Sequence, residues 1–415
     1  MPWKEVCMEE ERLKFVGMYL EAVYGMSELC REFGISRKTG YKLVRRYQGL
    51  GVEGLVDGSH ANHHHANAVT EEIEKEIVAL RALRPSWGAR KLRSHLQART
   101  EGKPWPAAST IGEILSRHGL VVRRGRSRKI PLYGSPFVGC GAANAVWCAD
   151  FKGWFRTADG SRCDPLTLSD AYSRYLLRCQ AVVRPDYGSV KPLFDAAFRE
   201  YGLPEAIRTD NGAPFASLAV GGLSQLSIAW IRLGIRPERI RPGHPEENGR
   251  HERMHRTLKA ETAKPPQATL RAQQRSFDRF RQVYNQERPH EALAQQTPAS
   301  HYQPSPRSLP LRLPEIDYPQ GYLLKRIRHR GFLLWKGQDL YLSETLDREV
   351  VGLTPQDERF YLVYFGPIKL AILDSKTMTL KRADSHKRGD GKAIAQETAF
   401  QAEGINKKVL PIPPV

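Results

Sequence analysis

The sequence lacks the patterns that mark several common classes of protein. Its six cysteines are scattered and form no C-x-x-C pair, which argues against a disulfide framework or a zinc knuckle and suits a reducing cytosol. The first residues contain no apolar run, so we expect no signal peptide. No lipidation signal or basic amphipathic helix is visible, so a membrane partner is not expected.

Long hydrophobic runs are scarce, and one uncharged stretch has a composition unlike that of a membrane span. Residues 211–231 carry no charge over about the length of a membrane span. Pro214, Gly221 and Gly222 interrupt this stretch, together with several serines. We therefore expect a connection followed by an amphipathic helix.

Positive charge is what the sequence has in excess. Across 415 residues, 64 Lys and Arg stand against 45 Asp and Glu, for a formal charge of +19. Such an excess favours a polyanionic partner, DNA or RNA, although a soluble basic protein without one is the alternative. The length predicts about two to four domains.

Residues 9–47 show the pattern of three short helices. We expect helices over 9–24, 27–33 and 37–47, with Ser27 and Ser36 as N-caps. Two helices joined by a short Gly-containing turn are typical of a helix-turn-helix module, with a structural three-helix domain as the alternative. The third helix carries the candidates for contacts with DNA, Arg37, Lys38, Lys42, Arg45 and Arg46.

A second helical module is predicted after a His-rich linker. Helices are expected from Thr70 to Leu83, up to about Ala98, and from a Ser109 cap to Arg117, with a short wing strand over 120–124. The candidates for DNA contacts in its middle helix are Arg90 and Lys91. A basic run follows, which either lies along a phosphate backbone or is a solvated linker; its cations are Arg123, Arg124, Arg126, Arg128 and Lys129.

The pattern then changes to alternating strands and helices. Strands are expected over 145–154, 165–169, 174–183 and 206–209, and helices over 190–201 and 270–284, which indicates an α/β layered domain. The first strand contains Asp150, and a buried charge is costly unless it has a partner or a metal.

Two further acids flank this region. Asp210 follows a short strand and enters an Asn-Gly turn. Glu252 lies on a helix that starts near residues 246–248, where Glu252, Arg256 and Lys259 at i, i+4 and i+7 share one face. Carboxylates beside cations can hold a divalent metal over a phosphate.

These segments resemble the retroviral-integrase superfamily. The motifs Trp-Cys-Ala-Asp ending at Asp150, Thr-Asp-Asn-Gly around Asp210, and Gly-Arg-His-Glu-Arg-Met around Glu252 look like its three acidic motifs. The segment Tyr284–Leu293 resembles the part that closes this core in bacterial insertion-sequence transposases. The resemblance implies an RNase H-like fold with a mixed five-stranded sheet.

The resemblance also implies the chemistry. Asp150, Asp210 and Glu252 would be the catalytic residues and would bind two Mg²⁺ ions, or Mn²⁺ in their place. Arg256 and Lys259 would contact phosphates, with Asn211 and His244 in supporting positions. The family's usual spacing from the second Asp would place the third acid at Glu246. We favour Glu252 because its flanking residues match the family helix.

The implied activity is that of a DNA transposase. It would cleave the terminal inverted repeats of the element and join the 3′-OH ends to target DNA, acting on double-stranded DNA as a homodimer or larger assembly in the bacterial cytoplasm, with the nucleoid. The alternatives are a helix-turn-helix repressor with a silent core and a phage or retroelement integrase.

Beyond the core we expect a Pro-rich linker, a small β-barrel of short strands, and a polar tail. The expected order is a helix-turn-helix domain at 1–50, a linker at 51–69, a second such domain at 70–125, a basic linker at 126–143, the core at 144–300, the Pro-rich linker at 301–328, the barrel at 329–382 and the tail at 383–415.

Overall fold

The structure is a computed structural model. It describes residues 8–57, 69–100, 102–121, 140–217, 219–240 and 249–383, with the backbone alone at 249 and 250. The expected basic run at 123–129, His244, Glu246 and the tail from residue 384 lie outside these ranges. The chain divides into two compact units, Met1–Thr70 and Glu71–Val415, and each is described by itself.

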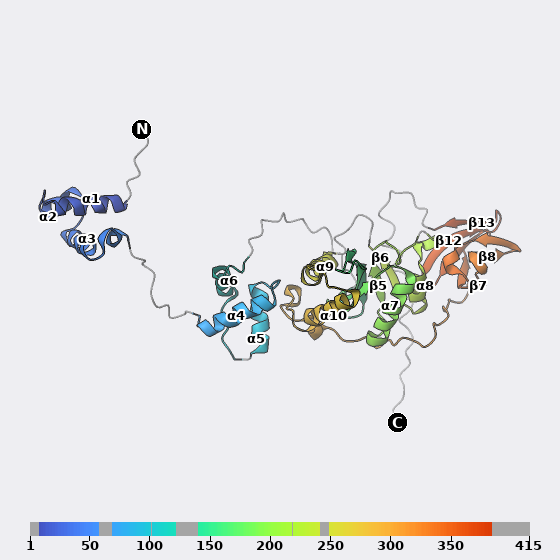
Figure 1. The fold of residues 1–415 in the computed structure, drawn as a ribbon. Coiled ribbons are helices and arrows are strands. Elements are labelled where there is room, and N and C mark those ends of the chain that lie inside the picture. Colours follow the sequence, from blue (N-terminus) through green and yellow to red (C-terminus); the bar gives the residue numbers. More distant parts are fainter. Residues whose placement is uncertain are drawn as a thin grey trace, which may run out of the picture. The chain divides into compact units, whose positions relative to one another are not determined.

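The first unit consists of three helices and a final turn (Figure 1, blue). These are α1 (Met8–Leu20), α2 (Met26–Glu32), α3 (Arg37–Leu50) and the 3₁₀ turn η1 (Gly51–Leu55). Ser36 caps α3 as predicted, because its side chain accepts a hydrogen bond from the Thr39 amide at 3.1 Å. Ser27 is not a cap, since Gly25 occupies that position and Ser27 lies inside α2. Leu55 is buried in this unit's core, so ordered structure continues beyond the boundary expected at residue 50.

Gly40 is the point where α3 approaches the other two helices most closely. A Cβ placed there would lie 2.7 Å from Cys30 Sγ, 2.8 Å from Met26 Sδ and 2.9 Å from the Phe15 ring. No room is left for a methyl group. Gly49, on the same helix, has no atom within 4 Å of such a Cβ.

We therefore expect opposite effects from one substitution at two positions of α3. Gly40→Ala should destabilise the first unit by about 1–3 kcal/mol, because the methyl group overpacks the core. Gly49→Ala should stabilise it by about 0.5–1 kcal/mol, because alanine has the higher helix propensity. Chemical denaturation of the full chain, followed by far-UV circular dichroism, measures both. Equal effects at the two positions would contradict the packing described.

The second unit begins with three helices, α4 (Glu71–Leu83), α5 (Ala89–Arg99) and α6 (Ala108–Arg117). The cap of α6 is Ala107, and Ser109 lies inside the helix, which corrects the expected Ser109 cap. Leu120 and Val121 form no strand, and the rest of the expected wing lies outside the described residues. This module touches the α/β core through an ion pair of 2.6 Å between Arg84 and Glu287.

The α/β core is built on a mixed sheet in the order β4-β3-β1-β5-β6, with the two-residue β2 added beside β3. The expected mixed sheet is confirmed, and with β2 it has six strands where five were expected. Its strands are β1 (Val146–Phe151), β2 (Phe155–Arg156), β3 (Arg162–Asp170), β4 (Leu176–Val182), β5 (Ala206–Thr209) and β6 (Arg236–Arg239). β1 is antiparallel to β3 and parallel to β5, which is in turn parallel to β6.

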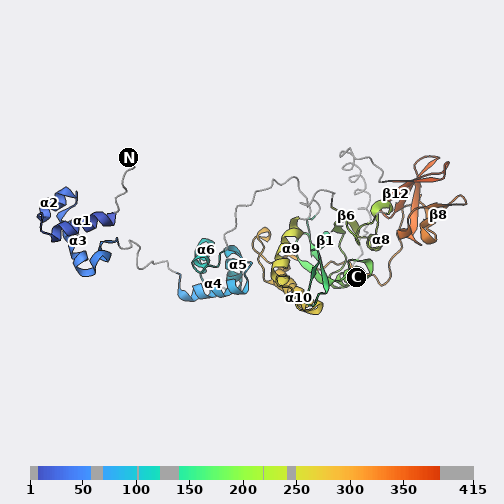
Figure 2. The ribbon, with the colours of Figure 1, turned by 45° about the horizontal axis from the view of Figure 1, so that its top comes forward.

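Helices cover both faces of this sheet. They are α7 (Tyr187–Tyr201), α8 (Gln225–Arg232), α9 (Gly249–Thr262) and α10 (Leu270–Gln286). Figures 1 and 2 show the strands between α9 and α10 on one side and α7 and α8 on the other. Trp147 and Ala149 of β1 belong to the cluster with α7 and α8. Met254 and Phe277 belong to a second cluster, under α9 and α10.

The uncharged stretch 211–231 contains α8 and the 3₁₀ turn η2 (Val220–Gly222), as an amphipathic connection should. Within the described ranges, no helix has the length and apolar character needed to cross a membrane. β6 was missed from the sequence because Arg236–Arg239 is mostly charged. Its Glu238 pairs in register with Arg208 of β5, and the two side chains form an ion pair of 2.8 Å.

The C-terminal part is an open sheet in the order β13-β12-β11-β10-β7, with a separate hairpin β8-β9. Its strands are β7 (Leu323–Arg326), β8 (Phe332–Trp335), β9 (Gln338–Tyr341), β10 (Val350–Pro355), β11 (Phe360–Phe365), β12 (Ile368–Asp374) and β13 (Thr379–Arg382). The expected closed barrel is not confirmed, because β7 and β13 are both edges. Each edge strand ends in Lys-Arg, and charged residues discourage further pairing at an edge. The sheet's core continues into α8 through Ile228 and Ile231.

Candidate active site

Strand register places the first two candidate acids side by side. Ala149 pairs with Thr209 across the parallel strands β1 and β5. Asp150 and Asp210 each follow these paired residues, so they lie at neighbouring positions at the same edge of the sheet. Asp210 is half-buried, and its Oδ1 accepts a hydrogen bond of 3.2 Å from the Gly212 amide.

Strand alternation decides which face Asp150 occupies. Trp147 and Ala149 face the α7 and α8 side, and successive residues of a strand point to opposite faces, so Asp150 faces α9. Thr167, its register partner on β3, donates its hydroxyl to the Asp150 carbonyl oxygen at 3.1 Å. The same hydroxyl oxygen lies 2.7 Å from Nε2 of His255 on α9. His255 Nδ1 lies 3.9 Å from Oδ2 of Asp150.

Burial keeps the histidines of α9 neutral. His255 and His251 are almost fully buried, and their rings meet edge to face at 5.2 Å between centroids. Burial lowers the pKa of His251 to about 4. The pKa of His255 is lowered further, first by burial and then by His251 and Lys152. A neutral imidazole packs beside the Asp150 carboxylate without neutralising it, and its hydrogen bond is with Thr167.

Asp150 and Glu252 open onto one cavity of about 520 Å³. Basic side chains outnumber these two acids along its wall. The cations are Lys152, Arg256, Lys259 and Lys264. Glu252, Arg256 and Lys259 thus share one cavity, as their spacing on α9 predicts. Such a wall suits a phosphodiester, because cations attract the phosphate and carboxylate oxygens are the kind of ligand that a metal bound to a phosphate takes.

Asp210 is not among the residues that line this cavity. Within the described ranges, no three or more His, Cys, Asp or Glu side chains come close enough together to hold a metal ion. The structure therefore brings Asp150 together with Glu252 in one cavity, and Asp150 together with Asp210 along the sheet edge. It does not draw all three into one cluster. Glu246, the alternative third acid, lies outside the described residues.

The supporting and DNA-binding candidates are distributed over the chain. Asn211 donates its side-chain amide to the Ile240 carbonyl oxygen at 2.8 Å, which ties the turn after β5 to the end of β6. On α3, four of the five candidate cations are exposed, and Arg46 is half-buried and bonded to the Val56 carbonyl oxygen. Arg90 is exposed and paired with Glu291 at 3.2 Å. Lys91 is half-buried at the edge of the core.

Three residues of the site were missed from the sequence. Lys152 had a usable signal, because it follows Asp150 by two positions in an extended segment and so shares its face. His255 had one too, since it lies three residues after Glu252 on the same helix. Lys264 lies beyond the end of α9, where no periodicity applies.

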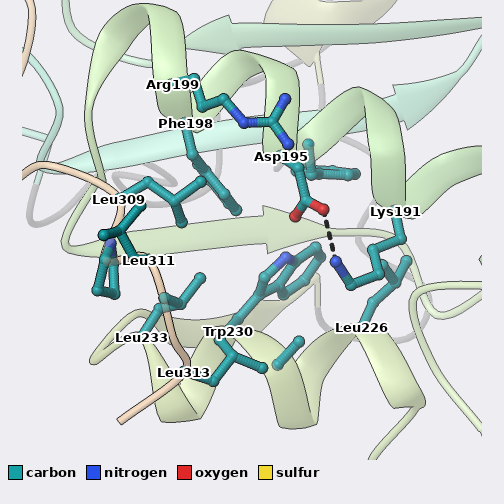
Figure 3. Close-up of a pocket in the computed structure, with 13 residues that line it drawn as sticks. Lys191, Asp195, Phe198, Arg199, Leu226, Trp230, Leu233, Leu309, Leu311 and Leu313 are labelled. Carbon is teal, nitrogen blue, oxygen red and sulfur yellow. Dashed lines mark hydrogen bonds and ion pairs between the residues drawn. The ribbon is translucent and has the colours of Figure 1, made fainter.

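Another cavity, of about 310 Å³, lies on the opposite face of the sheet between α7, α8 and residues 309–313. Figure 3 shows that Phe198, Trp230 and leucines form its wall and that Lys191 is paired with Asp195 at 2.5 Å. The acid and the lysine are engaged with each other, and Arg199 is the remaining charged residue among those that line this cavity.

The contact between His255 and Thr167 can be measured directly. His255→Leu should destabilise the core by about 1–3 kcal/mol, because it leaves the buried Thr167 hydroxyl without its imidazole partner. Adding Thr167→Val should recover part of that loss, with a coupling energy of about 0.5–3 kcal/mol in a double-mutant cycle. Chemical denaturation followed by tryptophan fluorescence reports it. Strict additivity would show that the two side chains do not interact.

Parts of the chain match known protein families. Residues 141–245 and 233–298 each match a family described as integrase core domain. Residues 11–63 match a helix-turn-helix domain, and residues 39–115 match a homeodomain-like domain. The matches fall on the first helical unit, the second helical module and the α/β core.

Two relatives belong to bacterial insertion elements. The chain is 29% identical over 275 residues to the uncharacterized 31.7 kDa protein of insertion element IS407 from Burkholderia multivorans, covering 65% of this chain and 91% of that protein. It is 28% identical over 237 residues to the uncharacterized 39.2 kDa protein of insertion element IS476 from Xanthomonas euvesicatoria, covering 55% and 64%.

Two solved structures are distantly similar. The HTLV-2 integrase catalytic core domain in complex with magnesium is 16% identical with a TM-score of 0.32, covering 39% of this chain and 99% of that one. A chain of the simian T-cell lymphotropic virus intasome in complex with PP2A regulatory subunit B56 gamma is 17% identical with a TM-score of 0.35, covering 75% and 100%. These low scores bear on neither mechanism nor partners. The family matches and the insertion-element relatives confirm the resemblance to bacterial insertion-sequence transposases of the integrase superfamily.

Proposed function

Starting from the integrase-core matches and the insertion-element relatives, we propose that the chain is a DNA transposase. It cleaves the ends of a mobile element and joins the freed 3′-OH ends to target DNA. The observation that carries this proposal is the cavity shared by Asp150 and Glu252, with four cations in its wall. Two helical modules that match DNA-binding families stand before the core in the chain and would hold the DNA.

The proposed metal ligands are Asp150, Asp210 and Glu252. Carboxylate oxygens are the ligands that Mg²⁺ prefers, and Mg²⁺ keeps several waters, so three carboxylates suffice for two ions. Like charges repel, and a divalent cation between carboxylates offsets that repulsion. The donor set and the adjacent strand ends therefore fit Mg²⁺ or Mn²⁺. When bound, the ions lower the barrier for attack on phosphorus and stabilise the leaving oxygen.

The chain's own residues bind and orient the DNA strand. Lys152, Arg256 and Lys259 hold the phosphate beside the acids, and His255 with Thr167 fixes the strand that carries Asp150. In joining, the 3′-OH oxygen forms a bond to a target phosphorus while that phosphorus loses its bond to the neighbouring 3′ oxygen. The proton of the 3′-OH passes to water and ends on the released 3′ oxygen. One phosphodiester replaces another, so no ATP is consumed.

The joining step distinguishes this proposal from a repressor with a silent core. Mutating residues that merely hydrogen-bond to metal ligands lowers metal affinity or activity by about 10–100-fold. Replacing a ligand itself, with Asp150→Asn, should therefore lower strand joining by about 100-fold or more. Binding of the element's ends should stay close to wild type. End-labelled duplexes carrying those ends report both quantities, by gel shift and by joined product. Asp317→Asn, an exposed acid outside the cavity, is the matched control.

If the Asp150→Asn variant joins DNA as well as the wild-type chain does, the proposed metal site takes no part in the reaction. Loss of both binding and joining would instead indicate a folding defect, which the thermal midpoint of the variant identifies. A retroelement-type integrase would perform the same chemistry, and the DNA that flanks the gene decides between the two. Because two ends must be joined together, the active form is proposed to be a homodimer or a larger assembly.

Metal binding itself has a readout that needs no DNA. Mg²⁺ or Mn²⁺ should raise the thermal midpoint of the wild-type chain. At a metal concentration of 100 times the dissociation constant, the free energy of unfolding should increase by about 2.7 kcal/mol. Asp210→Asn removes one ligand and one repelling charge, so the variant should start at least as stable in EDTA and gain less from the metal. An equal gain in both proteins would show that Asp210 is not a ligand.

A further inference from the structure

A second charged cavity, of about 270 Å³, adjoins the acidic one. Arg256 of α9 lines both. The second cavity is lined by basic side chains from α9, from the loop after β3, from the segment after α10 and from α5. Among the described residues that line it, the cations are Lys91, Arg174, Arg253, Arg256 and Arg288, and the one acid is Glu291.

The acids near this cavity are already engaged. Glu291 is paired with Arg90 at 3.2 Å. Glu261 lies 3.3 Å from Arg288 Nη1, which also donates to the Ser86 hydroxyl at 3.1 Å. Within the part of the chain that the structure describes, these two acids neutralise only part of the positive charge of the five cations. An exposed cluster of this kind is usually a solvated surface, but this one is partly buried.

Burial makes the excess charge costly. Arg288 and His290 are each 9% exposed, and His290 Nε2 has no hydrogen-bond partner among the described residues. Burial, and then the charge of Arg288, lowers the pKa of Lys91 to about 8. Burial, and then Arg253, lowers the pKa of Arg174, although Tyr284 acts the other way. An anion in the cavity would relieve these costs together, since opposite charge favours the charged form of each cation.

We propose that this cavity binds one non-reacting phosphate of the DNA strand whose neighbouring phosphate enters the acidic cavity. The inference rests on the proposed transposase function. Arg256 lines both cavities, so a DNA strand that occupies both stays in contact with α9. The guanidinium groups of Arg174 and Arg253 suit a phosphate because each offers several donors in a planar fork. The Arg-Pro-His segment at 288–290 thereby gains a role as part of the phosphate site.

Salt dependence of DNA binding tests the proposal without chemistry. The full chain is titrated with a duplex in EDTA, and the logarithm of the binding constant is plotted against the logarithm of salt concentration. The double variant Arg174→Gln/Arg253→Gln should bind several-fold more weakly, and its slope should fall by about 1, the value for one phosphate contact. The control Arg275→Gln/Arg279→Gln removes two exposed arginines of α10 that line neither cavity.

A slope equal to that of the control would overturn the proposal. A slope that falls by about 2 would also overturn it, because the two arginines would then contact different phosphates. A wild-type thermal midpoint confirms that the variant is folded.

Lys91 supplies a second measurement on the unmodified chain. Its lowered pKa leaves much of the amine unprotonated near pH 8, so it should react readily with an acetylating reagent. Duplex DNA in EDTA should slow this acetylation, because a bound phosphate raises the pKa of Lys91 and covers it. Lys191, paired with Asp195 on α7, is the internal control for mass spectrometry. Equal acetylation of Lys91 with and without DNA would overturn the proposal even where the double variant fails to fold.

The two proposals fail separately. If DNA does not protect Lys91 although the chain joins DNA, the proposed phosphate site is wrong and the transposase proposal stands. If DNA protects Lys91 but joining survives Asp150→Asn, the proposed catalytic acids are wrong and the cavity is a DNA-binding site.

Discussion

The register of β1 between β3 and β5 is the constraint on which the site depends. A slip of one residue would turn every side chain of β1 to the opposite face. Trp147 and Ala149 would then leave the cluster under α7 and α8, and Asp150 would enter it. The cost of burying a charge in that cluster, and of removing a tryptophan from it, fixes the register. The position of the first acid is therefore a consequence of apolar packing on the other face.

The position of α9 depends on α10, which is fastened to the sheet by polar side chains. Asn285 accepts a hydrogen bond from the Leu176 amide at 2.8 Å and donates one to the carbonyl oxygen of the same residue at 3.0 Å. Gln274 contacts the backbone of Ala181 and Cys179 in the same way, at 2.8 and 3.0 Å. Among the described strands β4 pairs with β3 alone, so these amides satisfy backbone groups along its other edge. They protect the edge and place α10, against which α9 packs.

The sequence predicted the elements whose pattern is local. β5 was placed at its observed bounds, and the i, i+4, i+7 spacing of Glu252, Arg256 and Lys259 correctly put them on one face. It did not predict β6, whose charges are accepted only because Arg208 lies opposite Glu238. Nor did it predict that the C-terminal sheet stays open, since closure depends on whether the two edge strands meet. Thr167 and His255 are 88 positions apart, and only the fold shows that they touch.

The two cavities along α9 follow from the geometry of one helix. Glu252 and Arg256 are one turn apart and line the acidic cavity, while Arg253 and Thr257, each one position on, line the cationic one. Successive residues of an α-helix are about 100° apart around its axis, so the two cavities lie on neighbouring faces of α9. A single DNA strand can therefore follow both. Arg256 lies at the boundary and is long enough to serve either side. Arg256 follows Glu252 by four positions and Arg253 follows it by one, so α9 presents one cation beside the acid and another to the cationic cavity. The same helix therefore sets the position of the acid and of positive charge in both cavities.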